Sequence, residues 1–158
     1  MSTTLPRHYE VELAWSGWDS AVLLAGDKVP IFGGSGDERQ SADWNPEQLL
    51  LSALSLCLMR SFEILAQREA LHVRGYRSRT EASLTMTRVG VGVRPGFTLL
   101  TVHVDLEVPP EDTVRARDLM VQAKQHCVVA NALMPPVHLE LNIGSTPLAE
   151  LAGAFTCR

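Results

Sequence analysis

A long apolar segment with a clearly marked start is the feature that most constrains the fold of this chain. Residues 49–59 are apolar apart from two serines. Asn45 suits the N-cap of a helix, Pro46 suits its first position, and Glu47 would lie at the positive end of the helix dipole. The pattern therefore predicts a helix from about residue 45 to residue 70. Its first half is apolar on nearly every side, so we expect a buried central helix.

Alternating apolar and polar residues predict strands on both sides of this helix. The expected strands cover residues 9–15, 21–25, 28–32, 76–86, 100–108 and 137–143, with a turn at 90–96 and a second helix at 111–126. The order is strands, long helix, two strands, helix, strand. That order predicts an α+β fold with a mainly antiparallel sheet covered by helices.

The size and composition of the chain indicate one domain. Its 158 residues are 46% hydrophobic, which is enough for a sizeable core. We expect a single domain over residues 1–158, with 1–8 and 144–158 as peripheral termini. The early strands look too short to cover both sides of the apolar helix. We therefore expect an obligate homodimer in which each chain helps to bury the other's helix.

The charge and the apolar pattern argue against several classes of partner. The formal net charge is −4 and there is no basic stripe, so nucleic acid is not expected as a partner. The first residues contain no apolar run of the signal-peptide kind, and the apolar segment is shorter than the roughly 20 residues of a membrane span. We expect a cytoplasmic protein without a membrane partner. The histidines show no ligand spacing, so no metal site is expected.

Two cysteines carry the candidate chemistry. Cys57 lies in the first helix and Cys127 at the end of the second, 70 residues later. In a reducing cytosol such thiols suggest redox chemistry rather than a structural cross-link. Either cysteine could also be inert core, because cysteine is among the most buried residue types. Cys157, close to the C-terminus, is expected to be a spectator thiol.

A reactive thiolate at Cys57 would need a nearby cation. Arg39, from the loop before the helix, and Arg60, three residues after Cys57, are the two candidates, although Arg60 could instead pair with Glu63. Glu47 would lie about 15 Å from Cys57 along one helix. It could orient an arginine, act on the partner chain's Cys57, or simply stabilise the first helical turn.

Two segments resemble those of a known protein family. They are Asn45-Pro46-Glu47-Gln48-Leu49-Leu50, with Cys57 ten residues after Glu47, and Cys127-Val128-Val129-Ala130-Asn131-Ala132-Leu133. Their order and spacing are similar to those of the OsmC/Ohr family of osmotically induced and organic hydroperoxide resistance proteins, over roughly residues 8 to 143. The resemblance implies an OsmC-like fold, with mainly antiparallel sheets wrapped around a long buried central helix. It also implies an intertwined homodimer with two active sites at the dimer interface.

The resemblance further implies a cysteine-based peroxidase that reduces organic hydroperoxides to alcohols in oxidative-stress defence. Cys57 would form a sulfenic acid, Cys127 would resolve it to a disulfide, and an external dithiol of the dihydrolipoyl type would recycle the pair. No bound cofactor is implied. Glu47 matches the family's active-site glutamate, and Arg39 sits near the place where some branches carry their arginine.

The chain departs from the family pattern at several positions. Val128 stands where proline is common, Ala130 where serine is frequent, and the turn at residues 16–19 lacks the arginine of one branch. These departures keep an alternative open, a non-catalytic OsmC-like protein that binds a small apolar molecule or a thiol. A third hypothesis is a cysteine hydrolase built on Cys127 and His126.

Overall fold

The computed structural model describes residues 9–15, 21–34 and 43–144 of the chain. The chain divides into two compact units, residues 1–50 and 51–158. Whether the two units form the single domain expected from the sequence stays a prediction. Arg39, Cys157 and the turn at residues 16–19 lie outside the described residues.

The first unit contains a small antiparallel sheet. Its strands are β1 (Glu12–Trp15), β2 (Ala21–Leu24) and β3 (Ile31–Gly33), paired in that order. The third strand begins three residues later than the sequence pattern suggested, because Lys28 still belongs to a turn in which its N–H bonds to Ala25. Gly33 is required where it is, since a Cβ there would lie 3.1 Å from Leu23 and 3.3 Å from the Trp44 carbonyl.

The long helix α1 (Pro46–Arg68) begins as its sequence predicts. The Asn45 side chain accepts a hydrogen bond from the Gln48 N–H at 2.7 Å, and Gln48 returns one to the Asn45 N–H at 3.1 Å. This reciprocal pair is a capping box. The helix ends two residues before the expected position, where Ala70 adopts a φ of 50°.

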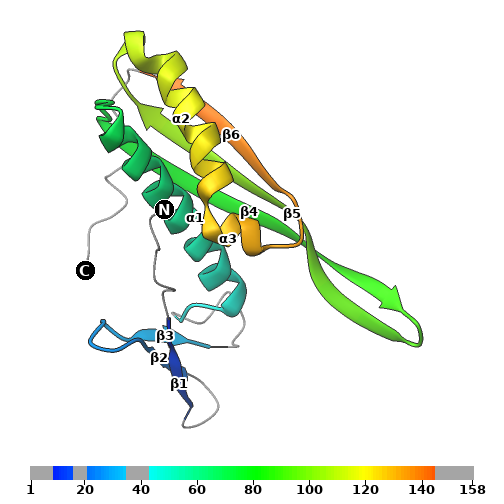
Figure 1. Cartoon of the computed structure of the whole chain (residues 1–158). Coiled ribbons are helices and arrows are strands. Elements are labelled where there is room, and N and C mark those ends of the chain that lie inside the picture. Colours follow the sequence, from blue (N-terminus) through cyan, green and yellow to red (C-terminus); the bar gives the residue numbers. More distant parts are fainter. Residues whose placement is uncertain (1–8, 16–20, 35–42, 145–158) are drawn as a thin grey trace, which may run out of the picture. The chain divides into compact units, whose positions relative to one another are not determined.

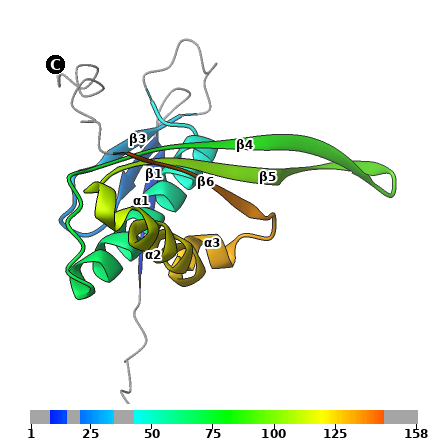
Figure 2. The ribbon, with the colours of Figure 1, turned by 90° about the horizontal axis from the view of Figure 1, so that it is seen from above.

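The second unit is a three-stranded sheet with helices on one face. Its strands are β4 (Gly75–Val89), β5 (Gly92–Glu107) and β6 (Val137–Gly144), and its other helices are a 3₁₀ turn η1 (Pro110–Asp112), α2 (Thr113–His126) and α3 (Val128–Ala132). Figures 1 and 2 show α1 and α2 on the same side of the sheet. β4 pairs antiparallel with β5, but β6 runs parallel to β5. The parallel pair is possible because α2 provides the crossover connection between them.

The core lies between the helices and one face of the sheet. Alternate residues of β5, from Leu100 to Leu106, are buried together with four α1 residues one turn apart. These α1 residues are Leu54, Leu58, Phe62 and Ala66. Ser55 adds a polar link from α1 to the sheet through a 2.5 Å hydrogen bond to Thr80.

Within this structure, α1 buries only one of its apolar sides. Leu56 is 60% exposed and Ile64 is 45% exposed. By length and composition α1 could also cross a membrane, although a helix in the core of a soluble protein can be equally long and apolar. The burial of the whole helix, as expected from the sequence, thus needs a further covering surface.

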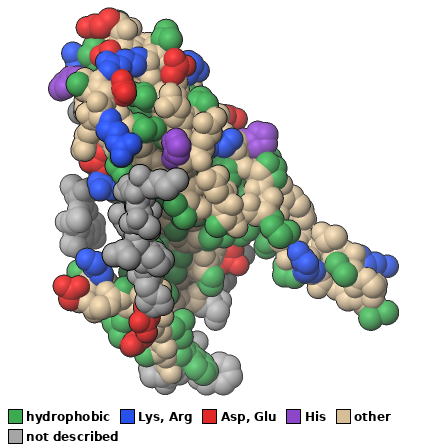
Figure 3. Space-filling view, viewed as in Figure 1, with side chains coloured by type: hydrophobic (Ala, Val, Ile, Leu, Met, Phe, Trp, Pro, Cys, Tyr) green, Lys and Arg blue, Asp and Glu red, His purple; other side chains and the backbone are tan. Residues whose placement is uncertain are grey.

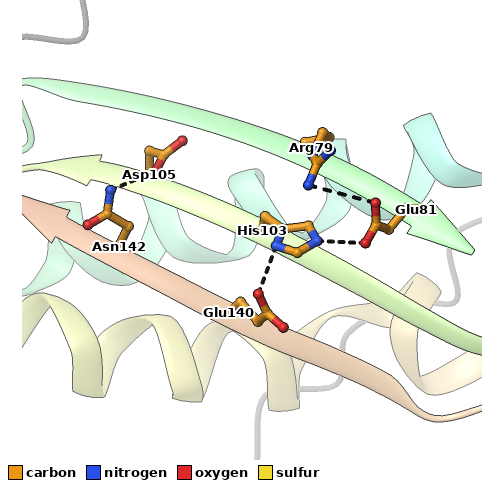
Figure 4. Close-up of polar contacts among 6 residues, drawn as sticks. All are labelled: Arg79, Glu81, His103, Asp105, Glu140 and Asn142. Atoms are coloured by element: carbon orange, nitrogen blue, oxygen red, sulfur yellow. Dashed lines mark hydrogen bonds and ion pairs between the residues drawn. The ribbon is translucent and has the colours of Figure 1, made fainter.

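The outer face of the sheet is polar, as the strand alternation predicts. Arg79, His103 and Glu140 are direct neighbours across the three strands. The two ring nitrogens of His103 lie 3.0 Å from Glu81 and 2.9 Å from Glu140, and Arg79 lies 3.7 Å from Glu81 (Figure 4). Beside them Asn142 donates a 3.0 Å hydrogen bond to Asp105. The contact with His103, followed by the charge of Arg79, lowers the pKa of Glu81.

The β4–β5 hairpin turns at a different place from the one that the sequence suggested. We expected a turn at residues 90–96, but Val89 pairs with Gly92, and the turn centres on Gly90 with a φ of 60°. Pro95 lies inside β5 opposite Met86. The proline is tolerated because β6 pairs with β5 only from Leu100 onwards, so β5 has a free edge there. The far end of this hairpin, around Gly90, carries exposed apolar side chains beside basic ones (Figure 3).

Candidate functional site

Cys57 lies in the middle of α1, at the border of its buried side. The residues next to it in the core row, Leu54 and Leu58, are fully buried, whereas Cys57 itself is half-buried and packs against the core. Its thiol is free. A helix interior fixes the direction of the side chain, so the position of the Cys57 sulfur is set by the packing of α1 on the sheet.

Cys127 occupies the junction between α2 and α3. Its extended backbone, with φ −73° and ψ 108°, ends α2, and its sulfur caps α3 by accepting a hydrogen bond from the Ala130 N–H at 3.4 Å. Its carbonyl accepts from Asn131 at 3.0 Å. The side chain is fully buried in the core.

The structure places these two thiols close enough to interact. The pKa of Cys127 is raised to about 11, first by burial and then by the neighbouring Cys57 thiol, while the N–H groups of Ala130 and Val129 act in the opposite direction. Cys127 is therefore a protonated thiol at neutral pH. Two free cysteines from different elements thus lie in one small site, one of them half-buried and the other enclosed.

Tyr76, at the start of β4, adds a buried hydroxyl to this region. Its ring packs on Phe62 with centroids 6.2 Å apart. The hydroxyl oxygen is fully buried and has no hydrogen-bond partner among the described residues. Burial raises the pKa of Tyr76, and a charge on Cys127 would raise it further. Ser78 acts in the opposite direction, but it does not reach hydrogen-bonding geometry with the hydroxyl.

A cavity of about 310 Å³ opens beside Tyr76. Most of its wall is apolar and a few polar groups complete it: Met59, Phe62, Glu63, Ala66, Gln67, Leu71, His72, Val73 and Tyr76. A cavity of this size and character suits a small organic molecule.

The other predicted site residues are exposed or lie outside the described residues. Arg60 is exposed and forms an ion pair with Glu63, which is the alternative that the sequence left open. Glu47 is exposed in the first turn of α1. Since Arg39 lies outside the described residues, its predicted pairing with Glu47 or with Cys57 stays a prediction.

Two further hypotheses can be compared with the described residues. No group of three or more histidine, cysteine or acidic side chains with metal-binding geometry occurs within residues 9–15, 21–34 and 43–144. His126 is exposed whereas Cys127 is buried, and the group that interacts with the Cys127 thiol is Cys57. The geometry therefore favours a cysteine pair over a cysteine–histidine pair.

Sequence reasoning missed the contribution of Tyr76. The strand alternation correctly placed its side chain on the inward face, but a strand pattern does not say how far a hydroxyl reaches along that face. The available signal was a tyrosine at an inward strand position without an evident hydrogen-bond partner, because a buried tyrosine hydroxyl usually has one.

Comparisons with known proteins identify the fold. Residues 36–142 match the family model described as OsmC-like protein. No curated protein matches the chain.

Three solved structures illustrate the likeness. An OsmC-like protein of unknown function from Vibrio cholerae has a TM-score of 0.74 at 14% identity, over 87% of this chain and 100% of that one. An OsmC-like protein from Mycoplasma pneumoniae has a TM-score of 0.74 at 13% identity, over 89% and 98%. An organic hydroperoxide resistance protein from Legionella pneumophila has a TM-score of 0.65 at 17% identity, over 88% and 99%. At such identities the likeness shows the fold alone, and it confirms the predicted α+β arrangement around a long helix.

Proposed function

The chain belongs to the OsmC-like protein family, and on that premise we propose that it is a thiol-dependent peroxidase that reduces organic hydroperoxides to alcohols. The observation that carries the proposal is the contact between the free thiols of Cys57 and Cys127. Similar proteins named for organic hydroperoxide resistance, such as those of Legionella pneumophila and Bacillus subtilis, share the fold.

The unequal environments of the two cysteines support distinct roles. Cys57 is half-buried, so a peroxide can approach it, whereas Cys127 is enclosed and protonated at neutral pH. In the first step the Cys57 thiolate attacks the O–O bond. It becomes a sulfenic acid, and the alkoxide leaves with a proton as the alcohol.

The second step uses the contact directly. The Cys127 sulfur attacks the Cys57 sulfenic acid, an S–S bond forms, and the S–OH oxygen leaves with the Cys127 proton as water. An external dithiol then reduces the disulfide by thiol exchange and is itself oxidised. Because Cys127 already interacts with Cys57 in the reduced state, the second step needs little rearrangement.

The remaining parts of the proposal concern activation, substrate and assembly. Arg39, oriented by Glu47, would favour the Cys57 thiolate, since Arg60 is already engaged by Glu63. The apolar cavity beside Tyr76 would suit the carbon chain of an organic hydroperoxide. The exposed apolar side of α1 would be covered by a second copy of the chain in the cytoplasmic protein.

Peroxide-induced loss of thiols tests this function. The reduced protein is mixed with an equimolar amount of cumene hydroperoxide, free thiols are counted over time, and the linkage is mapped by mass spectrometry. We expect rapid loss of two thiols with a Cys57–Cys127 bridge.

Two variants make the test specific. Cys57→Ser should lose the reaction completely, while Cys157→Ser should behave as the unmodified protein. Retention of all thiols by the unmodified protein would rule out the peroxidase and leave the alternative of a protein that binds a small apolar molecule or a thiol.

A further inference from the structure

The hydroxyl of Tyr76 is the buried polar group that the site does not yet use. A buried donor without a partner is costly, and native proteins keep few of them. This hydroxyl is enclosed and unpaired among the described residues, yet it lies near enough to Cys127 for a charge on that sulfur to act on it. An unpaired donor within electrostatic reach of a reacting sulfur suggests that its partner appears only during the reaction.

The environment of Cys127 shows why a donor would be needed. In the reduced protein the interaction with Cys57 raises the pKa of Cys127, so Cys127 keeps its proton towards Cys57, and its sulfur receives the Ala130 N–H at 3.4 Å. When Cys127 attacks, it gives up that proton. The buried sulfur then gains negative charge with the backbone N–H groups of Ala130 and Val129 as its donors, and a side-chain donor would stabilise it further.

Tyr76 is positioned to supply that donor. A tyrosine hydroxyl donates a hydrogen bond without losing its proton at neutral pH, and a raised pKa keeps it protonated. One side of the ring packs on Phe62, and the residue also lines the 310 Å³ cavity, which leaves room for the ring to move.

We propose that the Tyr76 hydroxyl donates a hydrogen bond to the Cys127 sulfur while that sulfur attacks oxidised Cys57. The inference rests on the proposed function and assigns Tyr76 to its second, disulfide-forming step. The Cys127 proton still leaves in the water molecule formed from the sulfenic oxygen, and Tyr76 keeps its own proton throughout.

The two tyrosines of the chain provide a matched pair of variants. Tyr76→Phe removes the buried hydroxyl, and Tyr9→Phe removes one from a side chain that is 80% exposed. After a single addition of cumene hydroperoxide, sulfenic acid is trapped with dimedone and disulfide is quantified at successive times by mass spectrometry. We expect Tyr76→Phe to form the disulfide about tenfold more slowly and to accumulate trapped Cys57 sulfenic acid, because a hydrogen bond to a charged group is lost. Tyr9→Phe should match the unmodified protein.

A misfolded variant would be recognised by its melting temperature, which for Tyr76→Phe should be equal or higher, since an unpaired hydroxyl is removed. The pH profile of disulfide formation in Tyr76→Phe should also be displaced to higher pH, which a purely structural role would not produce. Equal rates of disulfide formation in both variants would overturn the inference.

A second measurement separates this inference from the proposed function. In the Cys57→Ser, Cys157→Ser background Cys127 is the one remaining cysteine, and its alkylation by iodoacetamide reports its thiolate fraction without any peroxide. Tyr76→Phe should lower that rate about tenfold at each pH. If the unmodified protein forms no sulfenic acid but this difference is found, the peroxidase proposal fails and the tyrosine contact stands. If the difference is absent, the contact itself is disproved.

Discussion

At the scale of single residues, the two cysteines differ more in environment than in chemistry. Both are free thiols on the same small site, but burial and the neighbouring thiol raise the pKa of Cys127 to about 11. Such a group stays protonated at neutral pH and gains reactivity as the pH rises. The division of roles between the two thiols therefore follows from packing.

This asymmetry predicts the pH dependence of the proposed second step. Because Cys127 becomes a thiolate only as the pH approaches its raised pKa of about 11, disulfide formation should accelerate steadily through the alkaline range. The measurement is the rate of disulfide formation after peroxide addition, followed at several pH values. A rate that stays flat over that range would contradict the raised pKa.

The pKa of Cys127 also links to folding. The thiol would ionise near pH 9 in the unfolded chain and near pH 11 in the folded one, so the folded state binds more protons between these values. The contribution of Cys127 to the free energy of unfolding is thus fully present below about pH 9 and is lost as the pH rises towards 11. Any gain in reactivity at high pH accompanies a loss of stability.

Only part of this site could be predicted from the sequence. The pairing of Cys57 with Cys127 was inferred from two motifs and a family resemblance, because contact between residues 70 positions apart depends on tertiary packing. The ion pair of Arg60 with Glu63 was foreseeable, since three residues along a helix are neighbours. The buried hydroxyl of Tyr76 was not foreseeable, because its isolation depends on what surrounds it.

At the scale of elements, the capping box at the start of α1 is a local device whose contribution can be measured. Asn45→Ala removes the side-chain acceptor for the Gln48 N–H and should lower the free energy of unfolding by about 1 kcal/mol. Chemical denaturation measures the change.

Asn45→Ser is the matched control for that variant, because serine is also a good N-cap acceptor, and it should restore most of the loss. Equal destabilisation by alanine and serine would mean that Asn45 acts through other contacts than the cap.

Elements governed by local chemistry were the ones that the sequence predicted well. The start of α1 follows from three adjacent residues, and the strand alternation of β5 follows from its own side chains. The hairpin turn was misplaced because Gly90 and Pro95 both signal turns, and only the pairing of Val89 with Gly92 decides between them. The parallel direction of β6 depends on the crossover through α2, which no local pattern encodes.

At the scale of the whole molecule, the exposed apolar residues of α1 argue for assembly. Leu56 and Ile64 lie two turns apart on one side of the helix and are 60% and 45% exposed. The exposed Arg60 lies between them, and apolar side chains together with an arginine are a composition that protein–protein interfaces share. We expect a homodimer in which a second copy of the chain covers this side of α1.

A charge on that surface tests the dimer. Leu56→Glu should shift the protein from dimer to monomer in analytical ultracentrifugation, because a carboxylate would be buried at the interface. Val114→Glu places the same charge on α2 at a residue that is 71% exposed, and it should leave the mass unchanged. A monomeric unmodified protein at all concentrations would contradict the dimer.

The contact between Cys57 and Cys127 joins positions 70 residues apart in the chain. Folding thus gives the two sulfurs a very high effective concentration for each other, although they would rarely meet in the unfolded chain. Conversely, a disulfide between the two sulfurs closes a loop of this length. Because it restricts the unfolded chain, it should raise the free energy of unfolding by about 4 kcal/mol. Oxidation of the pair would make the protein harder to unfold, and reduction would return it to its original stability, so resistance to unfolding becomes a reporter of the redox state.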